Sequence, residues 1–248
     1  MLSLPNQETA CGIFTVAHFL SLALCIVVII CALYITRDIN LTSIRRITKI
    51  MAVSLAILEI LKIVFKLVIK DYSSPDHIIP LYYCTLFIVA TLLSGFCGGR
   101  VQKLGDCFIC GGSILGGIVY LIIPVTSFMD YPVYHFLSIH SMLFHSSMIF
   151  LGILYLRFGI CKPDFKGYQG YLLFTGSFLL FSLIINLAFK QNFMLISVPV
   201  NFPIDFINNL ARELPSLYTA LAIIAYLTLP YLTAKLFYPL ITIKNKHR

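Results

Sequence analysis

The chain has 248 residues, of which 59% are hydrophobic and 11% are charged, and its mean hydropathy is +0.94. A soluble domain of this size is about half apolar and about a quarter charged, so this composition excludes a soluble protein and indicates an integral membrane protein. The formal net charge of +8 comes largely from loops between apolar segments. The positive charge therefore reflects the membrane topology and an affinity for anionic lipid head groups. No nucleic-acid partner is expected.

Seven apolar segments are each about as long as a helix that crosses a bilayer. They cover residues 12–36, 47–70, 78–98, 103–124, 134–157, 168–190 and 215–241. We therefore predict an all-α polytopic membrane protein, a bundle of seven transmembrane helices in a single domain over residues 1–248. About four residues separate the third and fourth segments, which predicts a tight antiparallel hairpin. Pro80 and Pro230 are expected at or near span ends, where a missing N–H group is tolerated.

Basic residues gather in alternate loops and in the C-terminal tail, whereas residues 1–11 contain no Lys or Arg. These basic residues are Arg37, Arg45, Arg46, Lys49, Arg100, Lys103, Arg157, Lys162, Lys166, Lys244, Lys246 and Arg248. The positive-inside rule then places the N-terminus outside and the C-terminus in the cytoplasm. The absence of Trp and the frequent use of Ile, Lys and Asn favour an AT-rich bacterial genome, so we expect a bacterial plasma membrane.

Polar side chains inside the predicted spans are the strongest functional signal, because ionisable groups at membrane depth are costly unless they face a partner, a substrate or water. At a rise of about 1.5 Å per residue, several of them fall in the outer half of the bundle. They are His18, Glu59, Lys62, Cys84, His140, His145 and Asn186. The inner half contains little beyond Asp106. This asymmetry predicts a pocket open to the outer leaflet or to outer water.

The spacing of the ionisable residues limits their roles. Glu59 and Lys62 are i,i+3 neighbours and can form an ion pair, which would ease the burial of both. The pair could equally be purely structural and fix the helix register. His140 and His145 are five residues apart, so they project about 140° apart on a helix and are not expected to face one point. At most one of them is then expected to act chemically, and the other supports the site.

Cys84 is the candidate nucleophile, because a thiol within reach of a histidine can become a thiolate and attack an acyl carbonyl. Tyr82 could offer a hydroxyl to the same pocket. The alternative is packing, since cysteine in a span also behaves as a small hydrophobic residue. Cys107 and Cys110 form a C-x-x-C motif, but no second such pair exists to complete a zinc site. We therefore expect these two cysteines to pack, and we predict no metal site and no cofactor.

Five short motifs occur in order along nearly the whole chain. They are Phe14-Thr-Val-Ala-His18, Glu59 in the second span, Ile79-Pro-Leu-Tyr-Tyr-Cys84, Ser138-Ile-His-Ser-Met-Leu-Phe-His145 and Lys190-Gln-Asn192-Phe-Met194. In this order the motifs resemble the YwaF family of bacterial membrane proteins, which is related to eukaryotic transmembrane protein 164.

This resemblance implies a seven-span fold. In the eukaryotic relative it also implies Cys/His acyl transfer on phospholipids through an acyl-enzyme. His145 fits best, because it precedes Met148 and Tyr155 as the relative's histidine precedes its own counterparts. Cys84 fits less well, because the relative's cysteine precedes a histidine in a Pro-Cys-His sequence and Tyr82 stands nearest that histidine here. The alignment of Cys84 with the relative's cysteine can therefore be out of register by three residues.

The first hypothesis is a membrane acyltransferase or lipase-like enzyme acting on acyl esters of glycerolipids. Cys84 would be the nucleophile, and His145 or His140 the base. Glu59 or Asn192 would orient the imidazole or polarise the carbonyl. The hypothesis requires Cys84 and one histidine to lie within about 4 Å of each other, at the latest when lipid is bound. The residues expected to bind or orient a substrate are His18, Glu59, Lys62, Tyr82, Asn186 and Asn192.

Two other functions stay open. A small-molecule or proton-coupled transporter would use Glu59, Lys62 and a histidine as a relay, and it would need a polar path to both faces. A non-enzymatic lipid-binding membrane protein would need only the pocket and would be indifferent to the loss of Cys84. Membrane lipids are the expected partners in each case, and the sequence leaves self-association into a homo-oligomer open.

Overall fold

The computed structural model describes residues 9–72, 75–200 and 202–242. This part of the chain is helical and contains no strand, which confirms the all-α prediction. The basic residues Lys244, Lys246 and Arg248 lie outside the described residues. The α-helices are α1 (Val16–Ile35), α2 (Leu41–Val68), α3 (Leu86–Phe96), α4 (Gly99–Gly111), α5 (Ser113–Ile122), α6 (Phe136–Arg157), α7 (Phe165–Phe189), α8 (Asp205–Glu213) and α9 (Pro215–Ile241), with short 3₁₀ helices η1 (Pro75–His77) and η2 (Phe193–Leu195).

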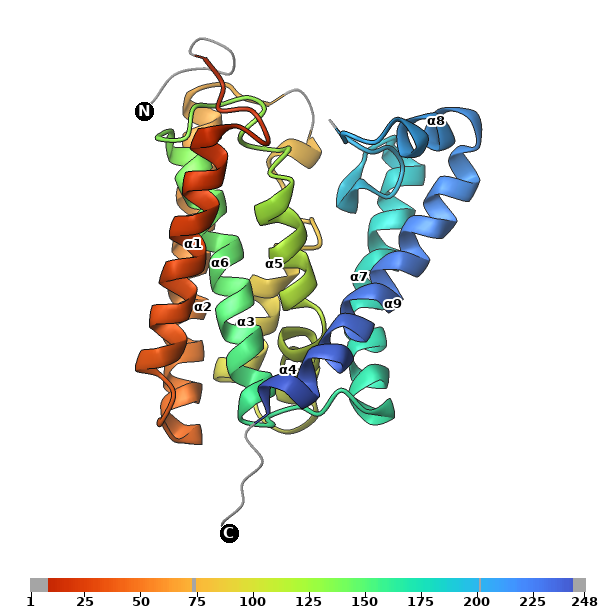
Figure 1. Cartoon of the computed structure of the whole chain (residues 1–248). Helices are drawn as coiled ribbons and strands as arrows, with labels where there is room; N and C mark the ends of the chain where they lie inside the picture. The colour runs from red at the N-terminus through yellow and green to blue at the C-terminus, as the bar shows by residue number, and fades with distance from the viewer. Residues whose placement is uncertain (1–8, 73–74, 201, 243–248) are drawn as a thin grey trace.

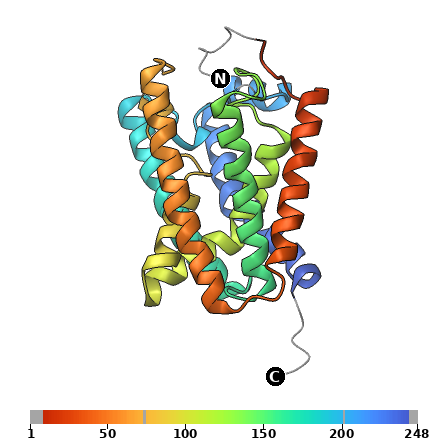
Figure 2. The same cartoon turned by 90° about the vertical axis from the view of Figure 1, so that its left-hand side faces the viewer.

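Helices α1 and α6 run side by side, whereas α9 runs obliquely across α7 (Figure 1). Figure 2 shows α6 between α1 and α2, and it contacts both. By length and composition, five helical stretches in the described part of the chain can cross a membrane: Val16–Ile35, Gly99–Ile122, Phe136–Arg157, Phe165–Phe189 and Pro215–Ile241. Charged residues along α2 and the shortness of α3 set these two helices apart from the five. The architecture is that of a multi-pass membrane protein.

The third predicted span, 78–98, is helical only from Leu86. Pro80 has no N–H group to donate, and the Thr85 hydroxyl accepts a hydrogen bond from the Tyr82 N–H at 2.9 Å and donates to the Pro80 carbonyl at 2.8 Å. The Leu81 carbonyl accepts from the Met194 N–H in η2 at 3.2 Å. Tyr82 and the next two residues therefore sit on non-helical backbone inside the bundle. Such backbone is tolerated at membrane depth where it is buried in protein or lines a cavity.

The fourth predicted span, 103–124, is divided into α4 and α5 at Gly112. The hydroxyl of Tyr83 donates to the Gly112 carbonyl at 3.1 Å. A Cβ atom at this position would come within 2.7 Å of that hydroxyl, so only glycine fits without displacing the ring. The break is thus set by an aromatic side chain from the unwound segment before α3, and hydropathy alone does not reveal it.

Pro230 lies inside α9, and the prediction that it marks a span end is wrong. Because proline has no N–H, the carbonyl four residues earlier, that of Tyr226, loses its helical donor. The hydroxyl of Tyr171 on α7 donates to this carbonyl at 2.5 Å. Proline in α9 therefore creates an acceptor through which α7 and α9 are joined.

A largely buried ion pair lies where α2 packs against the α3–α4 hairpin, at the end of the bundle where little polarity beyond Asp106 was expected. Arg45 on α2 donates to both carboxylate oxygens of Asp106 on α4, at 2.6 and 2.8 Å. The hydroxyl of Ser94 donates to Asp106 at 2.6 Å and lies 2.6 Å from the Tyr155 hydroxyl. Thr48 lies 2.9 Å from the same tyrosine oxygen. Four helices, α2, α3, α4 and α6, are thereby tied together.

This network makes a prediction about stability. Asp106→Ala leaves the partly buried Arg45 guanidinium without its carboxylate and should destabilise the protein by about 1.5–3 kcal/mol. The double variant Arg45→Met with Asp106→Leu removes both charges and should recover much of that loss. Thermal unfolding of the three proteins in one detergent measures the effect. Equal midpoints for wild type and Asp106→Ala would contradict it.

Candidate functional site

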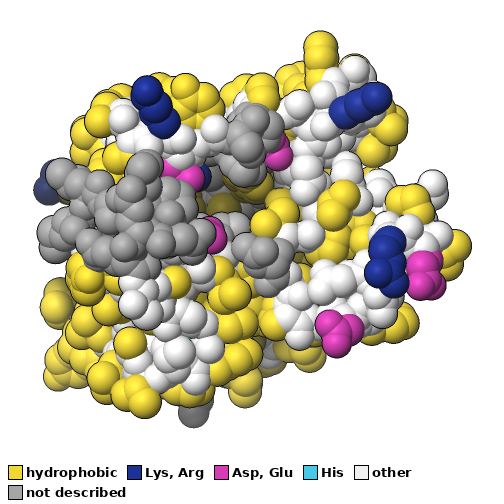
Figure 3. All heavy atoms as spheres, turned by 90° about the horizontal axis from the view of Figure 1, so that it is seen from above, with side chains coloured by type: hydrophobic (Ala, Val, Ile, Leu, Met, Phe, Trp, Pro, Cys, Tyr) yellow, Lys and Arg dark blue, Asp and Glu magenta, His cyan; other side chains and the backbone are white. Residues whose placement is uncertain are grey.

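A cavity of about 580 Å³ lies between α2, α5 and α6 on one side and α9 with the η2 region on the other. Seen from above, the molecule is hollowed between its two sides, and acidic side chains stand at the edge of the hollow (Figure 3). The lining includes Asp71, Asp76 and Asp130, but most of it is apolar. A deep apolar chamber with a few polar groups is typical of a site for a small or lipid-like ligand.

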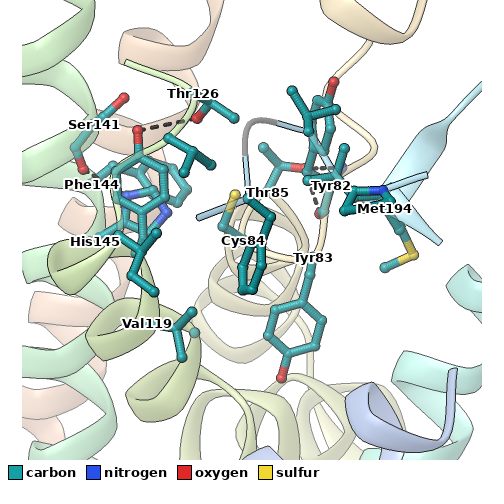
Figure 4. Close-up of a pocket in the computed structure, with 18 of the residues that line it drawn as sticks. Tyr82, Tyr83, Cys84, Thr85, Val119, Thr126, Ser141, Phe144, His145 and Met194 are labelled. Carbon is teal, nitrogen blue, oxygen red and sulfur yellow. Dashed lines mark hydrogen bonds between the residues drawn. The ribbon is translucent and has the colours of Figure 1, made fainter. Parts of the chain in front are cut away.

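Cys84 lines this cavity and is partly buried. Figure 4 shows it between His145 and Phe144 on one side and Tyr82 and Tyr83 on the other. In the part of the chain that the structure describes, the Cys84 thiol makes no hydrogen bond to a histidine. The thiol and the two imidazoles therefore share a chamber but are not joined by a hydrogen bond.

His145, also in the cavity lining, is held in one orientation. Its Nδ1 lies 2.7 Å from the carbonyl oxygen of Ser141, one helical turn earlier. A carbonyl oxygen can only accept, so Nδ1 carries the proton, and Nε2 of the neutral ring keeps its lone pair. The ring of Tyr120 on α5 stacks on the imidazole, with centroids 3.6 Å apart and planes 4° apart. The Tyr120 hydroxyl in turn donates to Ser127 at 2.9 Å and accepts from Thr126 at 3.2 Å.

A second polar group in the cavity is formed by Glu59, Lys62 and His140. The predicted ion pair between Glu59 and Lys62 is confirmed. His140 Nε2 lies 3.8 Å from the Glu59 carboxylate, and neither ring nitrogen makes a hydrogen bond to the described residues. His140 and His145 both line the cavity, contrary to the expectation that they could not face one site. The chamber is wide enough to reach both the α2 side and the α5 side of α6.

The mouth of the cavity is braced by a third set of contacts. Lys66 on α2 lies 3.4 Å from the carboxylate of Asp71, which accepts a hydrogen bond from the Tyr131 hydroxyl at 2.5 Å. Burial, together with this hydrogen bond, raises the pKa of Tyr131, so the phenol stays protonated and remains the donor. The Tyr82 hydroxyl, which was expected to face a substrate, donates to the Asp76 carbonyl at 2.8 Å, although the side chain does line the cavity.

His18 does not line the cavity. It is buried, and Nδ1 accepts from the Phe14 N–H at 3.0 Å. Nε2 therefore carries the proton and donates to the Leu121 carbonyl at 2.9 Å. With both nitrogens engaged, this histidine fastens the beginning of α1 to the end of α5.

The two asparagines shape the loop after α7 and do not reach the cavity. Asn186 bonds to both the N–H and the carbonyl of Phe193, at 2.8 and 3.0 Å. Asn192 accepts from Ser197 and Val198 and donates to the Val198 carbonyl. These contacts present Met194, in the next positions of the loop, to the chamber. In the structure the two asparagines therefore hold the loop that forms part of the cavity wall, and their own side chains do not line the cavity.

Tyr120 and Ser141, which hold His145, were not identified from the sequence. Ser141 acts through its backbone carbonyl, which every residue possesses. Tyr120 is one of 14 tyrosines in the chain, and nothing in its local sequence distinguishes it. Only the packing of α5 against α6 shows that it meets the imidazole.

The model of the TMEM164 family matches residues 13–233. The chain belongs to the TMEM164 family. The match runs from the start of α1 through most of α9, and it includes the cavity residues Cys84, Glu59, His140 and His145. Searches of curated proteins and of solved structures gave no match. Membership thus confirms the relationship to transmembrane protein 164, while the YwaF assignment stays a prediction.

The clamp on His145 predicts a tautomer. In wild type, ¹⁵N spectra of ring-labelled histidine in liposomes should show His145 protonated at Nδ1, with the signal assigned by its loss in His145→Gln. Tyr120→Leu removes the stacked ring and should give a mixture of tautomers, together with a loss of stability of about 1 kcal/mol. Tyr120→Phe keeps the ring and should retain the single tautomer. A wild-type signal protonated at Nε2 would disprove this assignment.

Proposed function

We propose that this TMEM164-family protein is a membrane-embedded acyltransferase or lipase-like enzyme that acts on acyl chains of glycerolipids through a Cys84 thioester. One observation carries the proposal. Cys84 stands on unwound backbone in an apolar chamber that it shares with His145, and the Nε2 atom of His145 is left as a proton acceptor by the Nδ1 hydrogen bond. A nucleophile, a base with a fixed tautomer and room for an apolar chain are the parts that acyl transfer needs.

The proposal includes the topology. Seven crossings would be made by α1, α2, residues 79–96, α4 with α5, α6, α7 and α9. In Figure 1, α1 begins at the top and α9 ends at the bottom, which suits an odd number of crossings. With the N-terminus outside and the C-terminus in the cytoplasm, the cavity would open to the outer leaflet. From the motifs and the composition, we also propose that the chain belongs to the YwaF branch and lies in a bacterial plasma membrane.

The chemistry follows from the atoms present. A lipid ester enters with its carbonyl between Cys84 and His145, and Nε2 takes the thiol proton as Sγ attacks the carbonyl carbon. The tetrahedral adduct then breaks its C–O bond, and His145 returns the proton to the departing lysolipid oxygen. Water or a lysolipid hydroxyl then attacks the thioester carbonyl while His145 removes its proton. The C–S bond breaks, and His145 returns the proton to the Cys84 sulfur. Water gives a lipase reaction, and a lysolipid gives acyl transfer.

The Glu59–Lys62–His140 group supports this chemistry. Lys62 lines the cavity and pairs with the Glu59 carboxylate one helical turn earlier. A cation and histidine N–H groups in a low-dielectric chamber stabilise an oxyanion more strongly than they would in water. His140 therefore has a supporting role, and His145 is the base.

The decisive test uses a phospholipid whose acyl chain carries an alkyne tag, offered to the purified protein in nanodiscs. Wild type should acquire the tag as a hydroxylamine-sensitive adduct on Cys84. Cys84→Ala should acquire none, and labelling of His145→Ala should be slower than that of wild type by about 100-fold or more. Cys31→Ala, which changes an exposed cysteine on α1, is the matched control and should label as wild type does. Tight binding of the lipid without any adduct would instead support a non-enzymatic lipid-binding protein.

A second candidate function, proton-coupled transport, is favoured by the Glu59–Lys62–His140 group, which resembles a relay of ionisable residues. If the protein is an acyltransferase, we expect Glu59→Gln to slow labelling of Cys84 by about tenfold or more, because the variant removes the partner of Lys62. It also expects no proton uptake into liposomes by either protein, measured with a pH-sensitive dye. Uptake by wild type that is lost in Glu59→Gln would favour the transporter.

A further inference from the structure

Three cysteines meet at the inner end of the bundle, at the opposite end from the mouth of the cavity. Cys107 and Cys110 belong to α4, at the bottom of Figure 1, and Cys161 lies in the turn between α6 and α7. The Sγ atoms of Cys107 and Cys161 are 3.4 Å apart, although 54 positions separate them in the sequence. The Cys110 thiol donates to the Cys161 carbonyl at 2.9 Å. The expectation that the C-x-x-C motif only packs did not include this third partner.

The surroundings hold the two thiols together. Gly170 on α7 covers Cys107 so closely that a Cβ atom there would lie 2.6 Å from the sulfur. A Cβ atom on Gly167 would lie 2.3 Å from the carbonyl of Lys162, which follows Cys161. The turn is also fixed from α9, where the Tyr231 hydroxyl donates to a backbone carbonyl of the turn at 2.7 Å. The proximity of the sulfurs thus results from tight packing on several sides.

Exposure assigns different roles to the cysteines. Cys107 is 7% exposed and Cys110 is 1% exposed, so a reagent in water does not reach them directly. Cys161 is only partly buried. A reagent that attacks the cluster therefore meets Cys161 first, and Cys107 is the thiol in position to resolve the product.

We propose that Cys107 and Cys161 form a redox-active dithiol, a modification site separate from the lipid cavity. All eight cysteines lie in the described residues and are free thiols. A small-molecule disulfide such as oxidised glutathione supplies the oxidant. The Cys161 thiolate attacks one of its sulfurs and releases one glutathione, and the Cys107 thiolate then attacks Cys161 Sγ and releases the second. Two protein thiols become one disulfide, and one oxidised glutathione becomes two reduced ones.

The reaction needs only a small movement. The sulfurs must close from 3.4 Å to the bond length of about 2.05 Å, which side-chain rotation in the Cys161 turn can provide. A disulfide there would join α4 to the α6–α7 turn and close a long loop, which restricts the unfolded chain. With the topology proposed above, the cluster faces the cytoplasm, where glutathione keeps thiols reduced. The disulfide would then form only under oxidising conditions.

Metal binding explains the cluster less well. Within the described residues, no group of three or more His, Cys, Asp or Glu side chains is arranged to hold a metal ion. The Cys110 thiol is directed to a backbone carbonyl and so does not complete a ligand set with the other two. Oxidation to a disulfide needs only the two sulfurs that are already close.

The test uses the full-length protein in nanodiscs, equilibrated with glutathione buffers of increasing oxidised fraction. The protein is then denatured, free thiols are blocked with N-ethylmaleimide, and disulfides are mapped by mass spectrometry. We expect the number of maleimide adducts per chain to fall by two in oxidising buffer and a Cys107–Cys161 cross-linked peptide to appear. Dithiothreitol should reverse both changes.

Two variants make the result specific. Cys161→Ser should show no loss of adducts from the cluster, and Cys31→Ser, at the exposed position on α1, should still lose two. Three results would overturn the proposal: full maleimide labelling of the cluster under oxidising conditions, glutathione left on Cys161 with Cys107 unmodified, or one equivalent of zinc bound by reduced wild type and absent from Cys161→Ser.

Discussion

Backbone that leaves the helix inside a membrane must find its hydrogen-bond partners within the protein, and this constraint shapes the candidate site. Two segments leave the helix, residues 79–85 and the loop around η2. They satisfy one another through the bond from the Met194 N–H to the Leu81 carbonyl. Two α9 tyrosines complete the arrangement, since Tyr226 donates to the Met194 carbonyl at 3.0 Å and Tyr218 to the Leu195 carbonyl at 2.9 Å. The cavity exists because these segments pack as loops where helices would fill the space.

The distribution of charge divides the molecule into a rigid end, which holds Arg45 and Asp106, and an open end, which holds the cavity. At the rigid end, Arg45 and Asp106 are joined by two short hydrogen bonds, and the Ser94 hydroxyl also donates to Asp106. In the cavity, Glu59 and Lys62 pair, but His140 has no hydrogen bond among the described residues. Fully satisfied buried networks rigidify a structure, whereas an incompletely satisfied polar group near a cavity is available to a ligand. The same residue types thus serve stability at one end and the proposed chemistry at the other.

Histidine roles in this chain follow from what each ring nitrogen contacts. His18 uses both nitrogens to join two helices, so it has none left for chemistry. His145 uses one nitrogen on a backbone carbonyl, which leaves the lone pair of the other nitrogen for the proposed role of a base. His140 uses neither on the described residues, although it lies beside a carboxylate. The sequence places both His18 and His140 in the same half of the bundle, so depth alone does not separate a structural histidine from a cavity residue.

The sequence by itself determined the class of protein, the approximate bounds of most helices and the pairing of Glu59 with Lys62, because hydropathy and helical spacing are local properties. It also singled out Cys84, His140 and His145, which the structure brings to one cavity. Tertiary structure decided where helices stop. The break at Gly112 depends on Tyr83, and the unwound start of α3 depends partly on η2. It also decided that Asn186 and Asn192 build a loop, that Tyr120 holds His145 and that Cys161 meets Cys107. Each of these contacts joins residues from different elements, and no local pattern encodes which side chain will fill the space opposite.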